Sequence, residues 1–170
     1  AHALVAADPV RSGQWQDIGA VTRRLLAFDE HEVLRDLILA ADWKSHDILR
    51  NSPLLAQHLY LIDCVDDALD LIDAVSARVA SSHPLSYAKA NALRYSGRMD
   101  EATDEYERCI RLQPDYPYAH WALAYHQKAD PPLSRIDRIR KAQATMDAAA
   151  PEQAYLHYAL FKEYDDAGEI

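Results

Sequence analysis

The chain has 170 residues and a formal net charge of −9 at pH 7. Because binding to nucleic-acid phosphates needs a basic face, this charge argues against a nucleic-acid-binding protein. No run of about 18 apolar residues is present, so we expect no membrane-spanning helix. Residues 1–9 lack the basic flank and the apolar core of a signal peptide, and we expect a cytoplasmic protein. Glycine is scarce, with four residues, and Ala and Leu are abundant, which favours helices.

The first third of the chain has helical periodicity without a clear repeat motif. Residues 3–9 are consistent with the end of a helix that a proline terminates. Apolar residues recur at helical spacing over residues 15–28, and a second helix is expected over residues 29–41. Residues 42–50 are irregular and are compatible with either a helical turn or a connector. Ser52 and Pro53 then predict the start of a helix, with the hydroxyl as its cap and the proline in its first turn.

Residues 84–115 have the most regular pattern and predict two helices joined at Gly97 and ended by Pro114. Gly97 can adopt the positive φ that lets the first helix stop and the chain reverse. Asp100 can accept hydrogen bonds from the free amides that open the second helix. The apolar face of this second helix consists of Ala102, Tyr106 and Cys109.

These residues resemble the tetratricopeptide repeat, a helix-turn-helix unit of 34 residues. The resemblance rests on Gly97, the triplet Asp100-Glu101-Ala102, Tyr106, Ile110 and Pro114. Counting back 34 residues places a repeat boundary at Leu49 and puts Asp63 at the turn, where a short polar side chain tolerates positive φ better than most. Counting forward places a helix start at Pro117, and the connection after that helix is expected to be lengthened at residues 130–133.

The repeat frame predicts an all-α protein, a right-handed α-solenoid of antiparallel helix hairpins with about nine helices in one domain. The expected units are a degenerate one near residues 15–48, then 49–82, 83–116 and 117–153, and a partial one at 154–170. A hairpin repeat cannot bury its apolar stripe alone. We therefore expect that the chain is part of a longer protein, or that the last helix self-associates through its uncovered face.

Residues 136–168 also resemble the junction in bacterial proteins where tetratricopeptide repeats precede a sulfotransferase domain. This resemblance rests on the basic helix at residues 136–142, Pro151 and the segment 156–168. It implies a complete protein that transfers sulfuryl groups from a nucleotide donor, with this chain as a regulatory or substrate-presenting region. The donor-binding loop of that family is not in this chain, so the chain itself is not expected to be an enzyme.

No group of residues predicts a catalytic site, a cofactor or a metal site. The eight histidines form no i, i+4 pair and lie near no cysteine at ligand spacing. The carboxylates of Asp66 and Asp67 are adjacent on a helix, so they point in different directions and cannot share a substrate proton. Cys64 and Cys109 fall at helix positions that suit burial, and we expect both to be small core side chains.

The resemblance to tetratricopeptide repeats implies a ligand groove on the first helix of each hairpin. The predicted groove residues are Tyr87, Asn91, Arg94, Tyr95, Tyr118, Trp121, Tyr125, Lys128, Tyr158 and Lys162. Aromatic rings offer flat apolar area, amides can bind an extended backbone, and cations suit an acidic ligand. The expected partner is a protein or extended peptide, or a downstream domain of the same chain. Packing between neighbouring helices is the alternative role for the aromatic residues.

One role within this family is excluded by the sequence. Repeats that clamp the carboxylate terminus of chaperones carry lysine, asparagine and arginine at fixed positions. Pro53, Gln57, Ala88, Tyr118 and Ala122 stand at those positions in this chain. A chaperone cofactor is therefore not expected.

Overall fold

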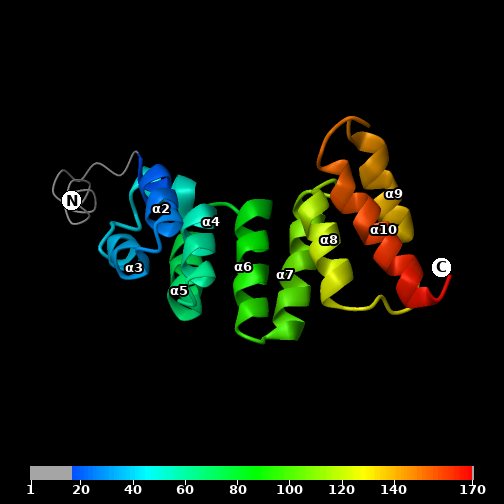
Figure 1. Ribbon diagram of the computed structural model, residues 1–170, viewed down its shortest axis with the longest axis horizontal. Coiled ribbons are helices and arrows are strands. Elements are labelled where there is room, and N and C mark those ends of the chain that lie inside the picture. Colours follow the sequence, from blue (N-terminus) through cyan, green and yellow to red (C-terminus); the bar gives the residue numbers. More distant parts are fainter. Residues whose placement is uncertain (1–16, 170) are drawn as a thin grey trace. The chain divides into compact units, whose positions relative to one another are not determined.

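The computed structural model describes residues 17–169, which form nine helices and no strand (Figure 1). In chain order they are α2 (Ile18–Ala27), α3 (His31–Leu39), α4 (His46–Leu61), α5 (Val65–Ser76), α6 (His83–Tyr95), α7 (Met99–Leu112), α8 (Pro117–His126), α9 (Ile136–Thr145) and α10 (Gln153–Ala167). The prediction of an all-α chain is confirmed for this range. No described helix is long and apolar enough to cross a membrane. The prediction for residues 3–9 lies outside the described range.

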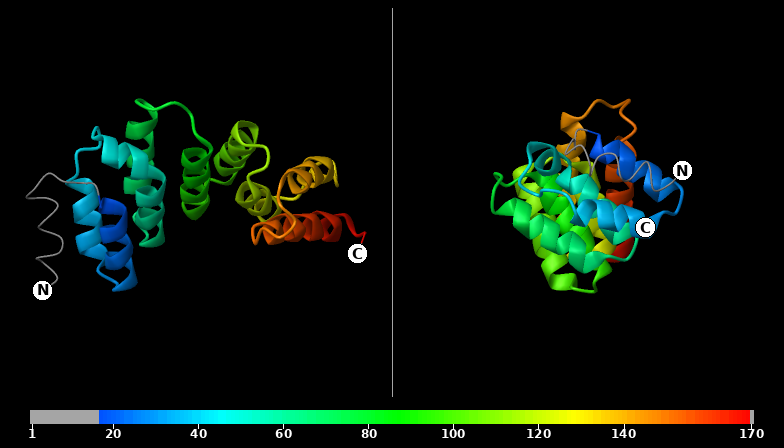
Figure 2. Two further views of the ribbon diagram at one scale, coloured as in Figure 1. Left: turned by 90° about the horizontal axis from the view of Figure 1, so that it is seen from above. Right: turned by 90° about the vertical axis from the view of Figure 1, so that its left-hand side faces the viewer.

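The helices belong to two compact units. The described part of the first unit is residues 17–81 with 91–98, and that of the second is residues 82–90 with 99–169. Within the first unit, α2 packs against α3 and α4, and α4 packs against α5. Within the second unit, α8 packs against α7 and α10, and α9 lies beside α10 (Figure 2). The pairs α2–α3, α4–α5, α7–α8 and α9–α10 are consecutive in the chain, whereas α2–α4 and α8–α10 join helices two positions apart.

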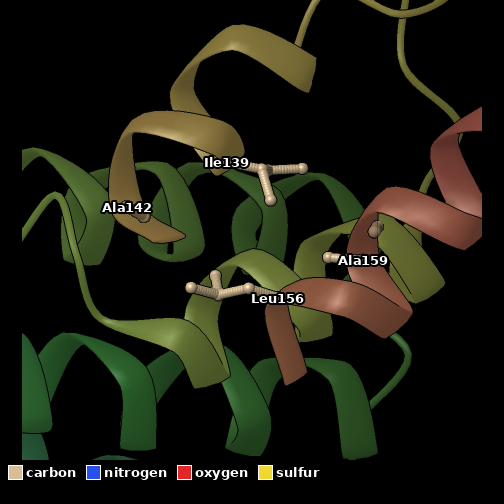
Figure 3. Packing of buried hydrophobic residues seen from close by; sticks show 5 residues of the cluster. Ile139, Ala142, Leu156 and Ala159 are labelled. Carbon is tan, nitrogen blue, oxygen red and sulfur yellow. The ribbon is translucent and has the colours of Figure 1, made fainter. Parts of the chain in front are cut away.

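Each unit has its own apolar core. In the first unit the core is aliphatic and includes Leu34, Ile38, Ile48, Leu55, Leu59, Leu71 and Ile72. In the second unit Ala124, Ile139, Ala142, Leu156 and Ala159 gather where α8, α9 and α10 meet (Figure 3). Three of these five residues are alanines, which let helices approach closely. The larger Ile139 and Leu156 fill the remaining space.

One backbone turn recurs along the chain. Asp29, Asp63 and Gly97 have φ angles of 56°, 66° and 77°, and they follow one another at intervals of 34 residues. In each turn the next amide donates to the carbonyl five residues earlier, from Glu30 to Leu25, Cys64 to Leu59 and Arg98 to Leu93, all at 2.9 Å. This is the Schellman bond that ends a helix at a left-handed residue. Gly168 and Glu169 form the same turn after α10.

The recurring turn confirms the turn predicted at Asp63 and adds one at Asp29. Residue 29 was expected to begin a helix, but its positive φ ends the preceding helix region and α3 begins only at His31. The sequence did not reveal this turn because aspartate is common at helix starts as well as in left-handed turns. The 34-residue period therefore extends one turn further toward the N-terminus than predicted.

Asp63→Gly is expected to raise the free energy of unfolding by roughly 1 kcal/mol. A Cβ atom is strained at positive φ, and glycine removes that strain. Urea denaturation of the variant and the original chain measures the difference. Asp70→Gly is the control, because Asp70 is exposed inside α5 and glycine there should give no gain. A loss of stability in Asp63→Gly would contradict this explanation of the turn.

The predicted helix start at Ser52 and Pro53 is wrong. Helix α4 begins at His46 and contains Pro53 in its interior, so residues 46–50 are helical and not a connector. Proline has no N–H to donate to the carbonyl of Leu49, four residues earlier. The Ser52 hydroxyl donates to that carbonyl at 2.8 Å. The acceptor keeps a partner, which lets the helix continue through the proline.

Two further predictions need correction. Cys64 is half-buried and precedes the first residue of α5, so it is not a core side chain within a helix. Cys109 is fully buried in α7, as predicted, with its sulfur 3.2 Å from the carbonyl oxygen of His83. Asp100 lies in the first turn of α7 and does not precede the helix, which begins at Met99. Its charge still suits the positive end of the helix dipole.

The lengthened connection predicted at residues 130–133 is confirmed between α8 and α9. Arg135 holds this connection in place. Its Nη1 atom donates to the carbonyl oxygen of Gln127 at 2.6 Å and to the carboxylate of Glu163 at 3.2 Å. The Arg135 and Glu163 side chains are only 11% and 3% exposed. Arg135 thereby joins the start of α9 to the middle of α10 through a buried ion pair and to the end of α8 through a hydrogen bond.

Candidate functional site

An aromatic cleft lies between α8 and the beginning of α10 in the second unit. Its volume is about 650 Å³, which falls within the range of small-molecule and side-chain pockets. The lining residues are Tyr118, Trp121, Tyr125, Pro151, Glu152, Ala154, Tyr155 and Tyr158. Five of the eight are aromatic, so the walls are mainly ring faces and ring edges.

Helical spacing brings these rings together. Tyr118, Trp121 and Tyr125 follow one another at three and four residues, which places them on one face of α8. Tyr155 and Tyr158 are three residues apart on α10. The other side of α8 is buried through small or aliphatic residues, Ala119, Leu123 and Ala124 among them. The helix therefore packs with one face and presents aromatic rings with another.

The rings of the cleft support one another. The ring of Tyr155 lies 4.6 Å from that of Tyr118 and 5.6 Å from that of Trp121, centroid to centroid. The rings of Trp121 and Tyr125 lie 5.7 Å apart. Tilted aromatic pairs at these distances contribute about 0.5–1.5 kcal/mol each beyond their burial. The side chains are thus ordered before any ligand binds, which lowers the entropic cost of binding.

A second row of rings adjoins the cleft at Tyr118. The ring centroid of Tyr116 lies 5.3 Å from that of Tyr118 and 5.5 Å from that of Tyr87. Burial raises the pKa of the Tyr116 hydroxyl well above its ordinary value. Burial also raises the pKa of Tyr118, with a further contribution from the nearby charge of Glu152. Both hydroxyls are therefore neutral at physiological pH.

Glu152 is the one charged residue among those that line the cleft. The two lysines predicted for the groove, Lys128 and Lys162, pair with Asp166. The Lys128 ammonium lies 3.4 Å from the carboxylate, and Lys162 donates to the same oxygen. The hydrogen bond from Lys162, more than that from Lys128, lowers the pKa of Asp166. The aromatic cleft itself is therefore acidic and not basic.

The predicted groove residues have different surroundings. Tyr118, Trp121, Tyr125 and Tyr158 line the cleft, and Tyr87 contacts Tyr118 at 6.4 Å between ring centroids. Four of the ten predicted residues are therefore brought together in one place.

Asn91, Arg94 and Tyr95 belong to the first unit. Asn91 is buried. The guanidinium of Arg94 lies 5.5 Å from the ring centroid of Tyr95, and Tyr95 stacks on Tyr60 at 5.1 Å. A ligand-binding role for these three residues stays a prediction.

Sequence reasoning missed Pro151, Glu152 and Ala154 as members of the site, and the predicted groove residues given above leave out Tyr155. Tyr155 stands three residues before Tyr158 on the same helix, and this spacing places both on one face. Nothing in the sequence marks Glu152 or Ala154. Their place in the cleft depends on how α10 packs against α8.

Residues 90–128 match the family model described as TPR repeat. This segment is therefore similar to a tetratricopeptide repeat. The match includes the turn at Gly97 and extends through α8, where three of the cleft residues lie. The repeat predicted around Gly97 is confirmed.

Three solved structures have a similar fold. A crystal structure of nearly identical TPR-like repeats from a Podosopora anserina putative kinesin light chain has a TM-score of 0.57 and 17% identity, over 99% of this chain and 85% of that one. A single-residue variant of the same repeats has a TM-score of 0.58 and 17% identity, with the same coverage of both chains. A crystal structure of MamA has a TM-score of 0.56 and 16% identity, over 98% of this chain and 84% of that one. These likenesses show the fold, a TPR-like α-solenoid.

No curated protein matches the sequence. The resemblance to the repeat region of bacterial sulfotransferases receives no support from these comparisons and stays a prediction from the sequence.

Proposed function

We propose that the chain is a scaffold that binds an extended protein segment, with the aromatic cleft as its binding surface. The observation that carries this proposal is the set of five aromatic rings around one open space of about 650 Å³. Tyr125 and Tyr158 are 48% and 59% exposed. Large aromatic groups left exposed together on a folded surface are typical of interaction sites. The bound segment can belong to another protein or to a further part of the same chain.

Binding would be dominated by a few rings near the middle of the cleft. Trp121 and Tyr155 contact each other and are both half-buried, so each has a face held by packing and a part left for a ligand. Tryptophan and tyrosine are the residues most often responsible for binding energy at interfaces. Because their rings are already packed, little side-chain freedom is lost when a segment binds.

A peptide selection tests this proposal. Peptides enriched from a random displayed library on the original chain are synthesised, and their dissociation constants are measured by calorimetry. We expect Trp121→Ala to weaken them at least about tenfold, because removal of a central aromatic group at an interface costs roughly 2 kcal/mol or more. Circular dichroism should show that the variant keeps its helical content.

Phe28→Ala is the matched control, because Phe28 is a large aromatic residue, 73% exposed, in the first unit and not in the cleft. It should bind the selected peptides as tightly as the original chain. Failure to enrich any peptide, or equal binding by Trp121→Ala, would reject the cleft as the binding surface.

A further inference from the structure

We infer that the aromatic cleft takes a basic side chain, lysine or arginine, from the segment it binds. The inference rests on the proposed function and adds the chemical class of the group that enters the cleft. It differs from the expectation of an acidic ligand, which depended on cations predicted for the groove.

The charge of the cleft comes from Glu152. This residue precedes α10, makes no side-chain capping bond to it, and forms no ion pair within residues 17–169. Its carboxylate therefore has no protein cation to neutralise it in the described part of the chain. A lysine or arginine in the cleft would supply one.

An acidic side chain would meet a less favourable surface. The lysines near this region, Lys128 and Lys162, share the carboxylate of Asp166, and neither lines the cleft. A ligand carboxylate between the rings would face Glu152, a like charge. The net charge of −9 adds to the attraction of cations over a longer range.

The aromatic walls favour a cation for a second reason. The face of an aromatic ring carries negative charge, and a cation within about 6 Å of the ring centroid is attracted to it, most strongly by tryptophan. The ring centroid of Tyr155 lies within 5.6 Å of the ring centroids of both Tyr118 and Trp121. One ammonium or guanidinium group can therefore approach more than one ring. The methylene stem of lysine or arginine would pack on the remaining ring surface.

Host peptides that differ at one position test the inference. A flexible nine-residue Gly/Ser peptide carries lysine, arginine, norleucine or glutamate at its centre, and its binding is followed by the shift of the Trp121 indole N–H resonance. Norleucine has nearly the length of lysine without the charge. We expect lysine and arginine to bind about three- to tenfold more tightly than norleucine, and glutamate most weakly. Added salt should reduce these differences.

The variant Glu152→Gln distinguishes the contribution of the carboxylate to binding from that of the aromatic rings. It should remove much of the preference for lysine over norleucine. Asp137→Asn is the matched control, since it removes the same charge from an exposed position on α9 that does not line the cleft. This control should keep the full preference.

The outcomes distinguish the inference from the proposed function. Equal binding of lysine and norleucine, or an unchanged preference in Glu152→Gln, would overturn the inference while peptide binding in the cleft stands. If neither the host peptides nor the library-selected peptides shift the Trp121 resonance, the proposed function fails and the inference fails with it.

Discussion

Glu163→Leu is expected to lower the free energy of unfolding by about 3–5 kcal/mol. The Glu163 carboxylate is 3% exposed and accepts from Arg135, which is 11% exposed. Removal of one partner leaves a buried guanidinium without its counter-charge, and this costs far more than a surface ion pair contributes. Urea denaturation followed by circular dichroism measures the loss.

The double variant Arg135→Met with Glu163→Leu completes a thermodynamic cycle. It should lose less stability than the sum of the single variants, because no isolated charge remains. Glu107→Leu is the comparison, since Glu107 pairs with Arg138 at 2.7 Å but both side chains are about a third exposed. Its loss should be near 1 kcal/mol. Equal losses for Glu163→Leu and Glu107→Leu would show that burial does not set the strength of the first pair.

A fall in pH is expected to cause the second large loss of stability. His58 in α4 is 3% exposed, and its Nδ1 atom is buried without a hydrogen-bond partner in the described part of the chain. Burial, with a smaller contribution from the charge of Arg23, lowers the pKa of His58 from 6.5 to about 4. As the pH falls, His58 takes up a proton in the unfolded chain before it does so in the folded chain. The free energy of unfolding is therefore fully retained above pH 6.5 and falls by roughly 3 kcal/mol as the pH approaches 4.

His58→Leu isolates this contribution. The difference in unfolding free energy between the variant and the original chain should move by about 2 kcal/mol in favour of the variant when the pH falls from 7.5 to 5. Urea denaturation at the two pH values measures this difference. His46→Leu is the control, because the His46 side chain is 86% exposed. A difference that does not change with pH in His58→Leu would contradict the assignment of the acid sensitivity to this residue.

The sequence predicted the hairpins where glycine or aspartate marks a turn that few other residues tolerate. Gly97 and Asp63 are examples, and the backbone angles of both agree with the prediction. It failed at Pro53, because the local pattern of a hydroxyl followed by proline is the same at a helix start as inside a helix where serine replaces the missing donor. Only the neighbouring packing of α4 decides between them.

The candidate site could be predicted in part for a similar reason. Tyr118, Trp121 and Tyr125 follow helical spacing, so their common face was visible in the sequence. The charge of the cleft could not be predicted from the sequence, because this charge depends on contacts between distant segments. Asp166 pairs with Lys128 across 38 positions of the chain, and Glu152 enters the lining through the packing of α10 on α8.

A crystal structure of the chain with a library-selected peptide tests most directly whether the aromatic cleft binds a protein segment. We predict that the peptide lies between α8 and α10, with one of its side chains against the rings of Trp121 and Tyr155. A peptide bound at another surface, with these two rings unoccupied, would contradict the claim.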